Sequence, residues 1–246
     1  MIVNEIEEQY NLIKNILLTW RKGAYQNLAK QLKANQEWQN RITIGKPALE
    51  TPEVPVEQAV DAFITLLREA EQREISEDAA RTLVEAYLAG KFTPEDIVAQ
   101  GLDAARGEMY LHLAVREALS CVAAIVLETV ALEHWRNKDC PVCGSEPSLA
   151  YFDEEGRRMV ICGTCAAEWR YHRTGCPLCG ERDSGKLLLL DAEEELPGWT
   201  VQTCRSCEGY IKIADLRKLS ERPDWQKAQI TTLPLDFAVE KWLSAK

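Results

Sequence analysis

The residues of this sequence with the clearest chemical potential are eight cysteines arranged as four C-x-x-C pairs. The pairs are Cys140/Cys143, Cys162/Cys165, Cys176/Cys179 and Cys204/Cys207, and a ninth cysteine, Cys121, stands alone. Two intervening residues let one tight turn direct both sulfurs toward a common point, and two such turns supply four thiolates to a tetrahedral metal ion. One pair is commonplace, whereas four pairs within 68 residues indicate two four-cysteine metal sites.

The four pairs form an internal repeat. Cys140-Pro-Val-Cys143-Gly144 recurs as Cys176-Pro-Leu-Cys179-Gly180, and each is followed by a second pair that leads into an aromatic segment. Proline fixes φ within the turn, and glycine after the second cysteine accepts a positive φ at low steric cost. The repeat favours sequential pairing, in which each half closes over its own ion. A crossed pairing would satisfy the same eight thiolates and stays open.

Other uses of the cysteines fit less well. Disulfides belong to oxidising compartments, and the sequence shows no secretory signal. Thioredoxin-like chemistry requires C-x-x-C at a strand-to-helix junction in a βαβ pattern, which is missing. A structural metal staple is the strongest competing interpretation. The segment is too short and loop-rich to be held by apolar burial alone, so the ions stabilise it whatever else they do.

Catalysis finds little support among the remaining residues. The three histidines are His112, His134 and His172; the first two fall in a helical segment, and His172 could substitute as a ligand only if a site lacked a cysteine. A filled tetrathiolate shell leaves no position for a reactive water. Phosphate-binding glycine loops and nucleophile motifs are missing as well. We therefore predict no catalytic residue, no organic-cofactor site and no enzymatic activity.

Composition narrows the class of protein further. The 246 residues carry a net charge of −10, with a hydrophobic fraction of 46% and a charged fraction of 28%. Nucleic-acid binding needs a positive field, but residues 140–215 hold thirteen Asp/Glu against eight Lys/Arg. The longest apolar run, residues 118–132, is interrupted by Glu128 and is shorter than a membrane span. We expect a cytoplasmic protein that binds neither nucleic acid nor a membrane.

Residues 1–136 are predicted to form a helical domain. Apolar residues recur at helical spacing in residues 6–32 and 56–71. Ser76 and Thr93 are candidate N-caps of two further helices, and a last helix over residues 103–135 is apolar almost all round, which is typical of a central buried helix. Cys121 lies on that helix and is interpreted as an inert core thiol.

From residue 137 onward, the pattern changes to short strands and tight turns. We predict one four-cysteine module over residues 137–173, a second over residues 174–216, and a tail over residues 217–246 with a short helix near residues 235–243. The fold class is therefore α+β: an all-helical N-terminal domain followed by two tandem rubredoxin-like or zinc-ribbon-like modules made of short β-hairpins.

The cysteine segment resembles the formate dehydrogenase accessory protein family (FdhE-type). The resemblance is carried by Cys-Pro-Val-Cys-Gly at 140–144, Cys-Gly-Thr-Cys-Ala-Ala-Glu-Trp at 162–169, Arg173 leading into Cys-Pro-Leu-Cys at 176–179, and Cys-Arg-Ser-Cys-Glu-Gly-Tyr-Ile-Lys at 204–212. It covers residues 138–216 well, and the sequence keeps all eight cysteines of the family pattern. The helical part matches only in general character.

The resemblance implies a cytoplasmic, non-enzymatic maturation factor that binds the catalytic subunit of a molybdenum- or tungsten-dependent formate dehydrogenase transiently. It also suggests iron in the two sites, while four thiolates alone would slightly favour zinc. Two alternatives are a zinc-ribbon nucleic-acid-binding protein, which the negative charge disfavours, and a rubredoxin-type electron carrier, for which the helical domain would be surplus.

Overall fold

The chain folds into two compact units. A computed structural model describes residues 2–32, 36–49, 55–191 and 196–244. One unit comprises Met1–Gln39 and Leu49–Val130, and the other comprises Asn40–Ala48 and Ala131–Lys246. The short helix α2 (Gln36–Thr43) spans the boundary between these segments and was not predicted from sequence. The second unit thus includes a segment, Asn40–Ala48, that precedes the cysteine region by about a hundred residues in the sequence.

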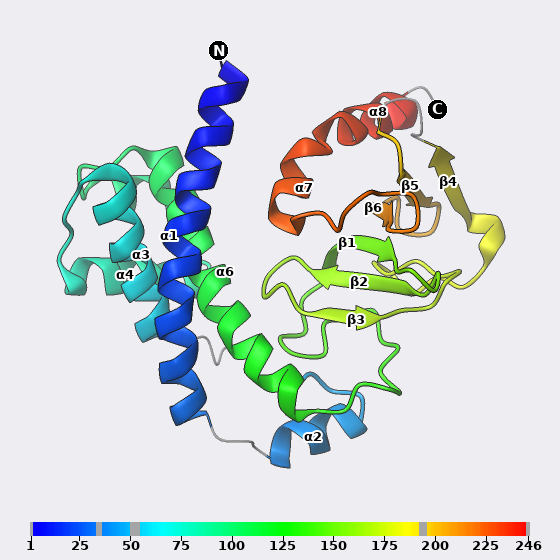
Figure 1. Ribbon diagram of the computed structural model, residues 1–246, viewed down its shortest axis with the longest axis horizontal. Coiled ribbons are helices and arrows are strands. Elements are labelled where there is room, and N and C mark those ends of the chain that lie inside the picture. Colours follow the sequence, from blue (N-terminus) through cyan, green and yellow to red (C-terminus); the bar gives the residue numbers. More distant parts are fainter. Residues whose placement is uncertain (1, 33–35, 50–54, 192–195, 245–246) are drawn as a thin grey trace. The chain divides into compact units, whose positions relative to one another are not determined.

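The first unit is helical, as predicted. It contains α1 (Ile2–Gln31), α3 (Val56–Glu71), α4 (Glu77–Leu88), α5 (Pro94–Val98) and α6 (Ala104–Thr129), which Figure 1 shows in blue to green. Helix α6 packs against α1, α3, α4 and α5, so it is the central helix of this unit. Cys121 lies on α6 and is fully buried.

Local signals set the ends of these helices. The Ser76 hydroxyl accepts a hydrogen bond from the Ala79 amide at 3.2 Å, and Thr93 forms a capping box with Asp96. Helix α6 ends at Thr129, six residues before the predicted end, because Val130 adopts an extended conformation. Beyond it, Trp135 is buried in the second unit, where its indole N–H donates to the Asp139 carbonyl at 3.1 Å.

Helix α6 also has the length and apolarity of a membrane span. In the structure, 78% of its most apolar window is buried among other residues of the chain. A core helix passes the same test of length and composition, and the other helices of the unit supply the apolar environment that this one requires.

The second unit is built on one six-stranded sheet. Its strands are β1 (Pro147–Phe152), β2 (Arg158–Cys162), β3 (Glu168–Arg170), β4 (Leu187–Asp191), β5 (Trp199–Cys204) and β6 (Tyr210–Asp215), and a short 3₁₀ turn, η1 (Ser184–Lys186), precedes β4. The order across the sheet is β3-β2-β1-β6-β5-β4 (Figure 1).

The two predicted metal modules are joined within this sheet. Each half forms an antiparallel three-stranded unit, β1-β2-β3 or β4-β5-β6. The halves meet through parallel pairing of β1 with β6, in which Leu149 lies beside Lys212 and Phe152 beside Asp215. The sequence pattern predicted two hairpin modules but gave no sign of this pairing. Because the shared ladder joins them, the modules form a single folded unit.

The residues predicted as a tail cover one face of the sheet. Helices α7 (Trp225–Thr231) and α8 (Leu233–Ser244) contribute Ala228, Leu235 and Val239 to a core shared with the sheet. The Trp225 ring stacks on Tyr151 at a centroid distance of 4.9 Å. The Arg222 guanidinium lies over both rings and also pairs with the Glu168 carboxylate at 2.6 Å. The C-terminal segment is therefore a structural layer of the second unit.

Candidate metal centres

The structure gathers the eight paired cysteines into two groups of four, in the sequential arrangement. The groups are Cys140/Cys143/Cys162/Cys165 (site 1) and Cys176/Cys179/Cys204/Cys207 (site 2). Each group joins the two C-x-x-C turns of one module. Crossed pairing is not what the fold adopts.

Both groups have the dimensions of a tetrathiolate site. In site 1 the sulfur atoms of Cys140 and Cys165 are 3.6 Å apart, and those of Cys143 and Cys162 are 3.5 Å apart. The corresponding distances in site 2 are 3.8 Å and 3.7 Å, and within each group all four sulfurs lie within 4.8 Å of one another. A tetrahedron with metal–sulfur bonds of about 2.3 Å has sulfur–sulfur edges of roughly 3.8 Å. Each group could therefore hold one ion without rearrangement.

All four C-x-x-C turns share one backbone geometry. In each, the amide of the first cysteine donates to the carbonyl five residues later, at 2.8–2.9 Å. The acceptors are Ser145, Ala167, Glu181 and Gly209. The residue directly after the second cysteine has a positive φ in every turn, with values of +77° at Gly144, +58° at Ala166, +83° at Gly180 and +56° at Glu208.

Of these four positions, only the two glycines were predicted from sequence to have a positive φ. Ala166 and Glu208 are non-glycine residues in the left-handed region, which costs about 1–2 kcal/mol for an L-residue. Both residues follow the second cysteine of a C-x-x-C pair, as Gly144 and Gly180 do, and this equivalence in the repeat could have predicted their positive φ. Because the same positive φ occurs with glycine, alanine and glutamate, the C-x-x-C turn and not residue preference sets this conformation.

Backbone amides also point at the sulfurs. The Val142 amide lies 3.4 Å from the Cys140 sulfur, and the Thr164 and Cys165 amides lie 3.3 Å and 3.4 Å from the Cys162 sulfur. Such N–H groups stabilise thiolate charge, which a four-cysteine site concentrates in a small volume. The turns of site 1 thus supply part of the electrostatic compensation that a bound ion would complete.

The two sites differ in their exposure to solvent. In site 1, Cys140, Cys162 and Cys165 are buried and Cys143 is half-buried, whereas in site 2 Cys179 and Cys207 are exposed. Burial raises the pKa of the Cys140 thiol, and burial also raises the pKa of Cys176 to about 12. Four ionised thiolates at these positions require a cation, so the donor set is consistent with bound metal in both sites.

A carboxylate links the two turns of site 2. Glu181 accepts hydrogen bonds from the Ser206 hydroxyl at 2.6 Å and from the Asp183 amide at 2.9 Å, and it pairs with the Lys186 ammonium at 2.9 Å. These partners, led by the Ser206 hydroxyl, lower the pKa of Glu181 to about 2. Glu181 follows Gly180 of one turn, and Ser206 lies within the other, so this contact holds the turns together independently of the ion.

A buried arginine lies beside the backbone that enters site 2. Arg158 is 1% exposed and donates to the Gly175 carbonyl at 2.8 Å, directly before Cys176. Its Nε and Nη2 atoms have no hydrogen-bond partner among the described residues. Burial lowers the pKa of Arg158 to about 10, and the electrostatic influence of the nearby Tyr171 and Cys176 side chains opposes that effect. Sequence reasoning gave Arg158 no role, because nothing in its neighbourhood along the chain distinguishes it from a surface residue.

His172, the histidine considered as a substitute ligand, joins neither group, and neither do His112 and Cys121. His172 packs edge-on against Tyr171, and His112 accepts or donates a hydrogen bond at 2.8 Å with the Tyr87 hydroxyl. Cys121 is buried within the helical unit, where burial raises its pKa to about 11, as expected for an inert core thiol.

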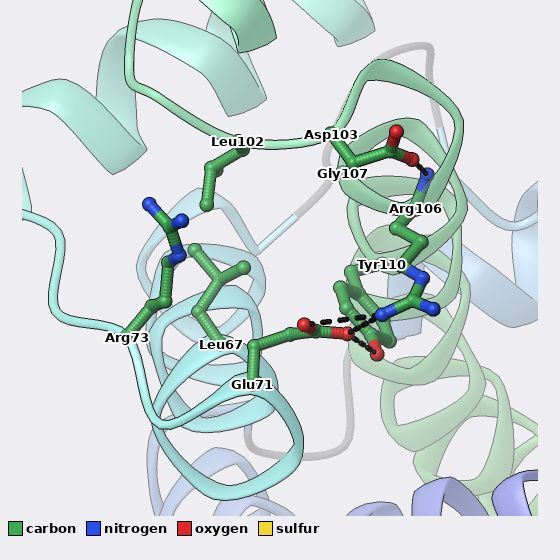
Figure 2. A pocket seen from close by; sticks show the side chains of 8 residues that line it. All are labelled: Leu67, Glu71, Arg73, Leu102, Asp103, Arg106, Gly107 and Tyr110. Atoms are coloured by element: carbon green, nitrogen blue, oxygen red, sulfur yellow. Dashed lines mark hydrogen bonds and ion pairs between the residues drawn. The ribbon is translucent and has the colours of Figure 1, made fainter.

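A cavity of about 230 Å³ lies within the helical unit, between α3 and α6 (Figure 2). At its wall, the Glu71 carboxylate accepts from the Tyr110 hydroxyl at 2.7 Å and from Arg106 at 3.3 Å. Arg73 donates to the Gly101 carbonyl at 2.7 Å. Burial and this hydrogen bond raise the pKa of Tyr110 to about 12, so Tyr110 acts as a donor and not as a base. The polar side chains at this wall form hydrogen bonds with one another and with the backbone, as is typical of a structural contact between helices.

The fold and the two cysteine groups define an α+β protein in which a helical unit is followed by two modules that could each hold a metal ion. The FdhE central-domain family model matches residues 139–173. FdhE homologs of Aquifex aeolicus and Pseudomonas aeruginosa are 31% and 30% identical over 75% and 71% of this chain, respectively. A crystal structure of the P. aeruginosa FdhE protein covers 94% of this chain and 90% of its own, with a TM-score of 0.56 and 21% identity, and so shares the fold.

The chain belongs to the FdhE family. It spans 66% of the length of the A. aeolicus relative and 53% of the P. aeruginosa relative. The resemblance inferred from the cysteine motifs is thereby confirmed, and so is the α+β fold with two four-cysteine groups.

Proposed function

We propose that this protein is a non-enzymatic maturation factor for a molybdenum- or tungsten-dependent formate dehydrogenase. Its membership of the FdhE family carries the proposal, together with the retention of all eight cysteines in two complete groups. The family acts as an accessory to formate dehydrogenase and is generally not catalytic. A closed four-thiolate site suits this task, because it stabilises a surface without activating a water molecule.

The proposed partner is the catalytic subunit of that enzyme, bound before its assembly is complete. A maturation factor must release its client, so we expect an interface of modest area. The client is bound through the helical unit and the two metal modules. Eight thiolates and a net charge of −10 favour a protein client over a nucleic acid. Cysteines used as metal ligands are typical of reducing compartments, which supports the proposal that the protein is cytoplasmic.

The metal in both sites is proposed to be iron, with zinc as the alternative. The cysteines of each group would hold it, and when bound it would cross-link the two turns of a module. Ferric thiolate sites absorb visible light through sulfur-to-metal charge transfer, whereas zinc has a filled d shell and gives a colourless protein. A red colour in protein purified without oxygen from iron-replete cells and then oxidised would support iron.

The function is tested by complementation. Deleting the gene should abolish formate oxidation without stopping synthesis of the catalytic polypeptide. The wild-type chain and a Cys121→Ala variant, which changes a cysteine outside both groups, should restore activity. A Cys176→Ser/Cys179→Ser variant should not, because loss of the second ion unfolds the turns that form site 2. Full activity from that variant, with loss of its second metal demonstrated, would refute the mechanism.

A further inference from the structure

The backbone that enters site 2 is held by three buried side chains. The Gly175 carbonyl, directly before Cys176, accepts a hydrogen bond from Arg158 of β2 at 2.8 Å. The same carbonyl accepts from the side-chain amide of Gln202, on β5, at 3.2 Å. The Cys176 carbonyl accepts from the Tyr171 hydroxyl at 3.0 Å. Because Arg158 belongs to the first module and Gln202 to the second, strands of both modules hold the first turn of site 2.

Arg158 is the charged member of this group. Arg158, Tyr171 and Gln202 are 1%, 3% and 5% exposed, respectively. The Gln202 amide is neutral, and burial raises the pKa of Tyr171, so the phenol is a neutral donor at pH 7. Although burial lowers the pKa of Arg158 to about 10, the guanidinium still carries its proton at pH 7. One full positive charge is therefore buried beside the entry to site 2.

The structure gives this charge little of the usual compensation. Taking a guanidinium out of water is costly unless a carboxylate and several hydrogen bonds replace the water. Among the described residues, no carboxylate forms an ion pair with Arg158, and its Nε and Nη2 atoms have no hydrogen-bond partner. The ionisable side chains that act on it electrostatically are Tyr171 and Cys176. Since Tyr171 is neutral, Cys176 is the group that can supply negative charge.

A loaded site 2 supplies that charge. Cys176 is 2% exposed and belongs to a group of four cysteines whose sulfurs lie within 4.8 Å of one another. Four thiolates carry four negative charges, so a divalent ion leaves two of them uncompensated and a trivalent ion leaves one. The buried guanidinium therefore faces a site whose net charge depends on the oxidation state of the metal.

The first module holds the equivalent carbonyl without a charge. The internal repeat places Asp139, directly before Cys140, at the position of Gly175. The Asp139 carbonyl accepts from the Trp135 indole N–H at 3.1 Å, and this donor is neutral. The neighbouring Lys138 ammonium pairs with the Asp139 carboxylate at 2.8 Å, so these two charges offset each other. The donors that hold the first turns of the two sites thus differ in charge.

We propose that Arg158 is a positioning residue that balances the charge of site 2, so that this site favours its more negative metal–thiolate state. The role requires a metal ion in site 2, which is part of the proposed function. A fixed positive charge in a buried environment stabilises a site with two net negative charges more than a site with one. With iron in the site, Arg158 therefore favours the ferrous state over the ferric state and raises the reduction potential.

The test is a redox titration of the full chain, loaded with ferrous iron in both sites without oxygen and followed by visible absorption. The wild-type chain should show two one-electron transitions, one for each site. In Arg158→Met, the ratio of ferrous to ferric iron at a fixed potential should fall about tenfold in one transition, the order expected for one charge in a protein interior. For a one-electron couple this is a fall of about 59 mV. The other transition should not move.

Gln202→Met is the matched control for the hydrogen bond. It removes a donor from the same Gly175 carbonyl and places the same side chain in the same buried layer, but it removes no charge. Its ratio should change less than about twofold. Arg158→Lys keeps the charge and should stay within about threefold of the wild-type ratio. Arg158→Gln keeps a donor without the charge, and it decides the matter if Arg158→Met does not hold its iron.

Glu181→Gln identifies which transition belongs to site 2. Glu181 joins the two turns of that site through the Ser206 hydroxyl, and its charge is partly offset by Lys186. Removing this negative charge should raise the ferrous fraction at site 2 by about threefold, less than a fully buried charge would, because solvent screens it. The transition that rises in Glu181→Gln should be the one that falls in Arg158→Met.

Three results would overturn the role of Arg158: unshifted transitions in both neutral variants, an equal fall in Gln202→Met, or a fall confined to the transition that Glu181→Gln leaves in place. The last result would assign the charge of Arg158 to site 1. A wild-type chain that holds no ion in site 2 would overturn the proposed metal occupancy as well, whereas a loaded chain with unshifted transitions would overturn this role alone.

Discussion

At the scale of single residues, the position after each C-x-x-C pair carries the strongest local constraint. Gly144 and Gly180 occupy it with φ near +80°, a conformation in which an added Cβ is strained. The two positions differ in their surroundings. A Cβ on Gly144 would lie 3.1 Å from the Pro47 side chain, whereas one on Gly180 would meet nothing within 4 Å.

We therefore predict that Gly144→Ala destabilises the second unit more than Gly180→Ala does. Each substitution should cost about 1 kcal/mol through the positive φ, and Gly144→Ala should cost more because Pro47 must also shift. Urea unfolding of the metal-saturated chain measures the difference, with Gly180→Ala as the matched control for backbone strain. Equal losses of stability would show that the Pro47 side chain can move away from the new Cβ at no energetic cost.

At the scale of elements, the C-terminal helices hold the sheet through a small number of contacts. Trp225 stacks on Tyr151 of β1, and Arg222 connects this pair to Glu168 of β3. These contacts fix α7 over the first module, while Ala228, Leu235 and Val239 fill the space above the sheet. Removing the stacked ring should loosen α7 and expose that core.

Trp225→Ala should destabilise the second unit by about 2 kcal/mol, because a large, partly buried aromatic side chain and its stacking are lost together. Phe237→Ala is the control from the neighbouring helix α8. Its ring is 67% exposed, so the change should stay within about 0.5 kcal/mol. Urea unfolding followed by the signal of the second unit measures both. Comparable losses in the two variants would contradict the role assigned to Trp225.

The elements that sequence reasoning recovered are those with local signals. Ser76 and Thr93 marked helix starts through their capping side chains, and the C-x-x-C spacing located both metal groups. Helix α7 was missed because its N-cap, Asp224, lies in a polar stretch with little apolar periodicity. Arg158 and the β1–β6 pairing depend on residues distant along the chain, which no local pattern encodes.

At the scale of the whole molecule, the two units rely on different sources of stability. The helical unit is held by apolar burial around α6, where Tyr110, Leu111 and Cys121 are at most 1% exposed. In the second unit, the turns of each site bring four cysteine sulfurs together, where a bound ion would cross-link them. Metal removal should therefore affect the units unequally.

Stripping both ions with a strong chelator should unfold the second unit while the helical unit persists. Cys121 reports on the outcome, because it is buried in the helical unit and burial raises its pKa to about 11. Alkylation followed by mass spectrometry should label the eight paired cysteines rapidly and leave Cys121 unmodified until denaturant is added. Rapid labelling of all nine cysteines would mean that the helical unit does not stay folded once the metal modules have unfolded.

The parallel pairing of β1 with β6 has a consequence for the order in which the chain can fold during translation. Residues 147–152 leave the ribosome before residues 210–215, so the first hairpin can form while its outer edge still lacks a neighbour. A nascent chain that has not reached residue 210 would expose the backbone groups of β1 that later pair with β6. Until the last strand arrives, the growing polypeptide would itself carry an unprotected strand edge.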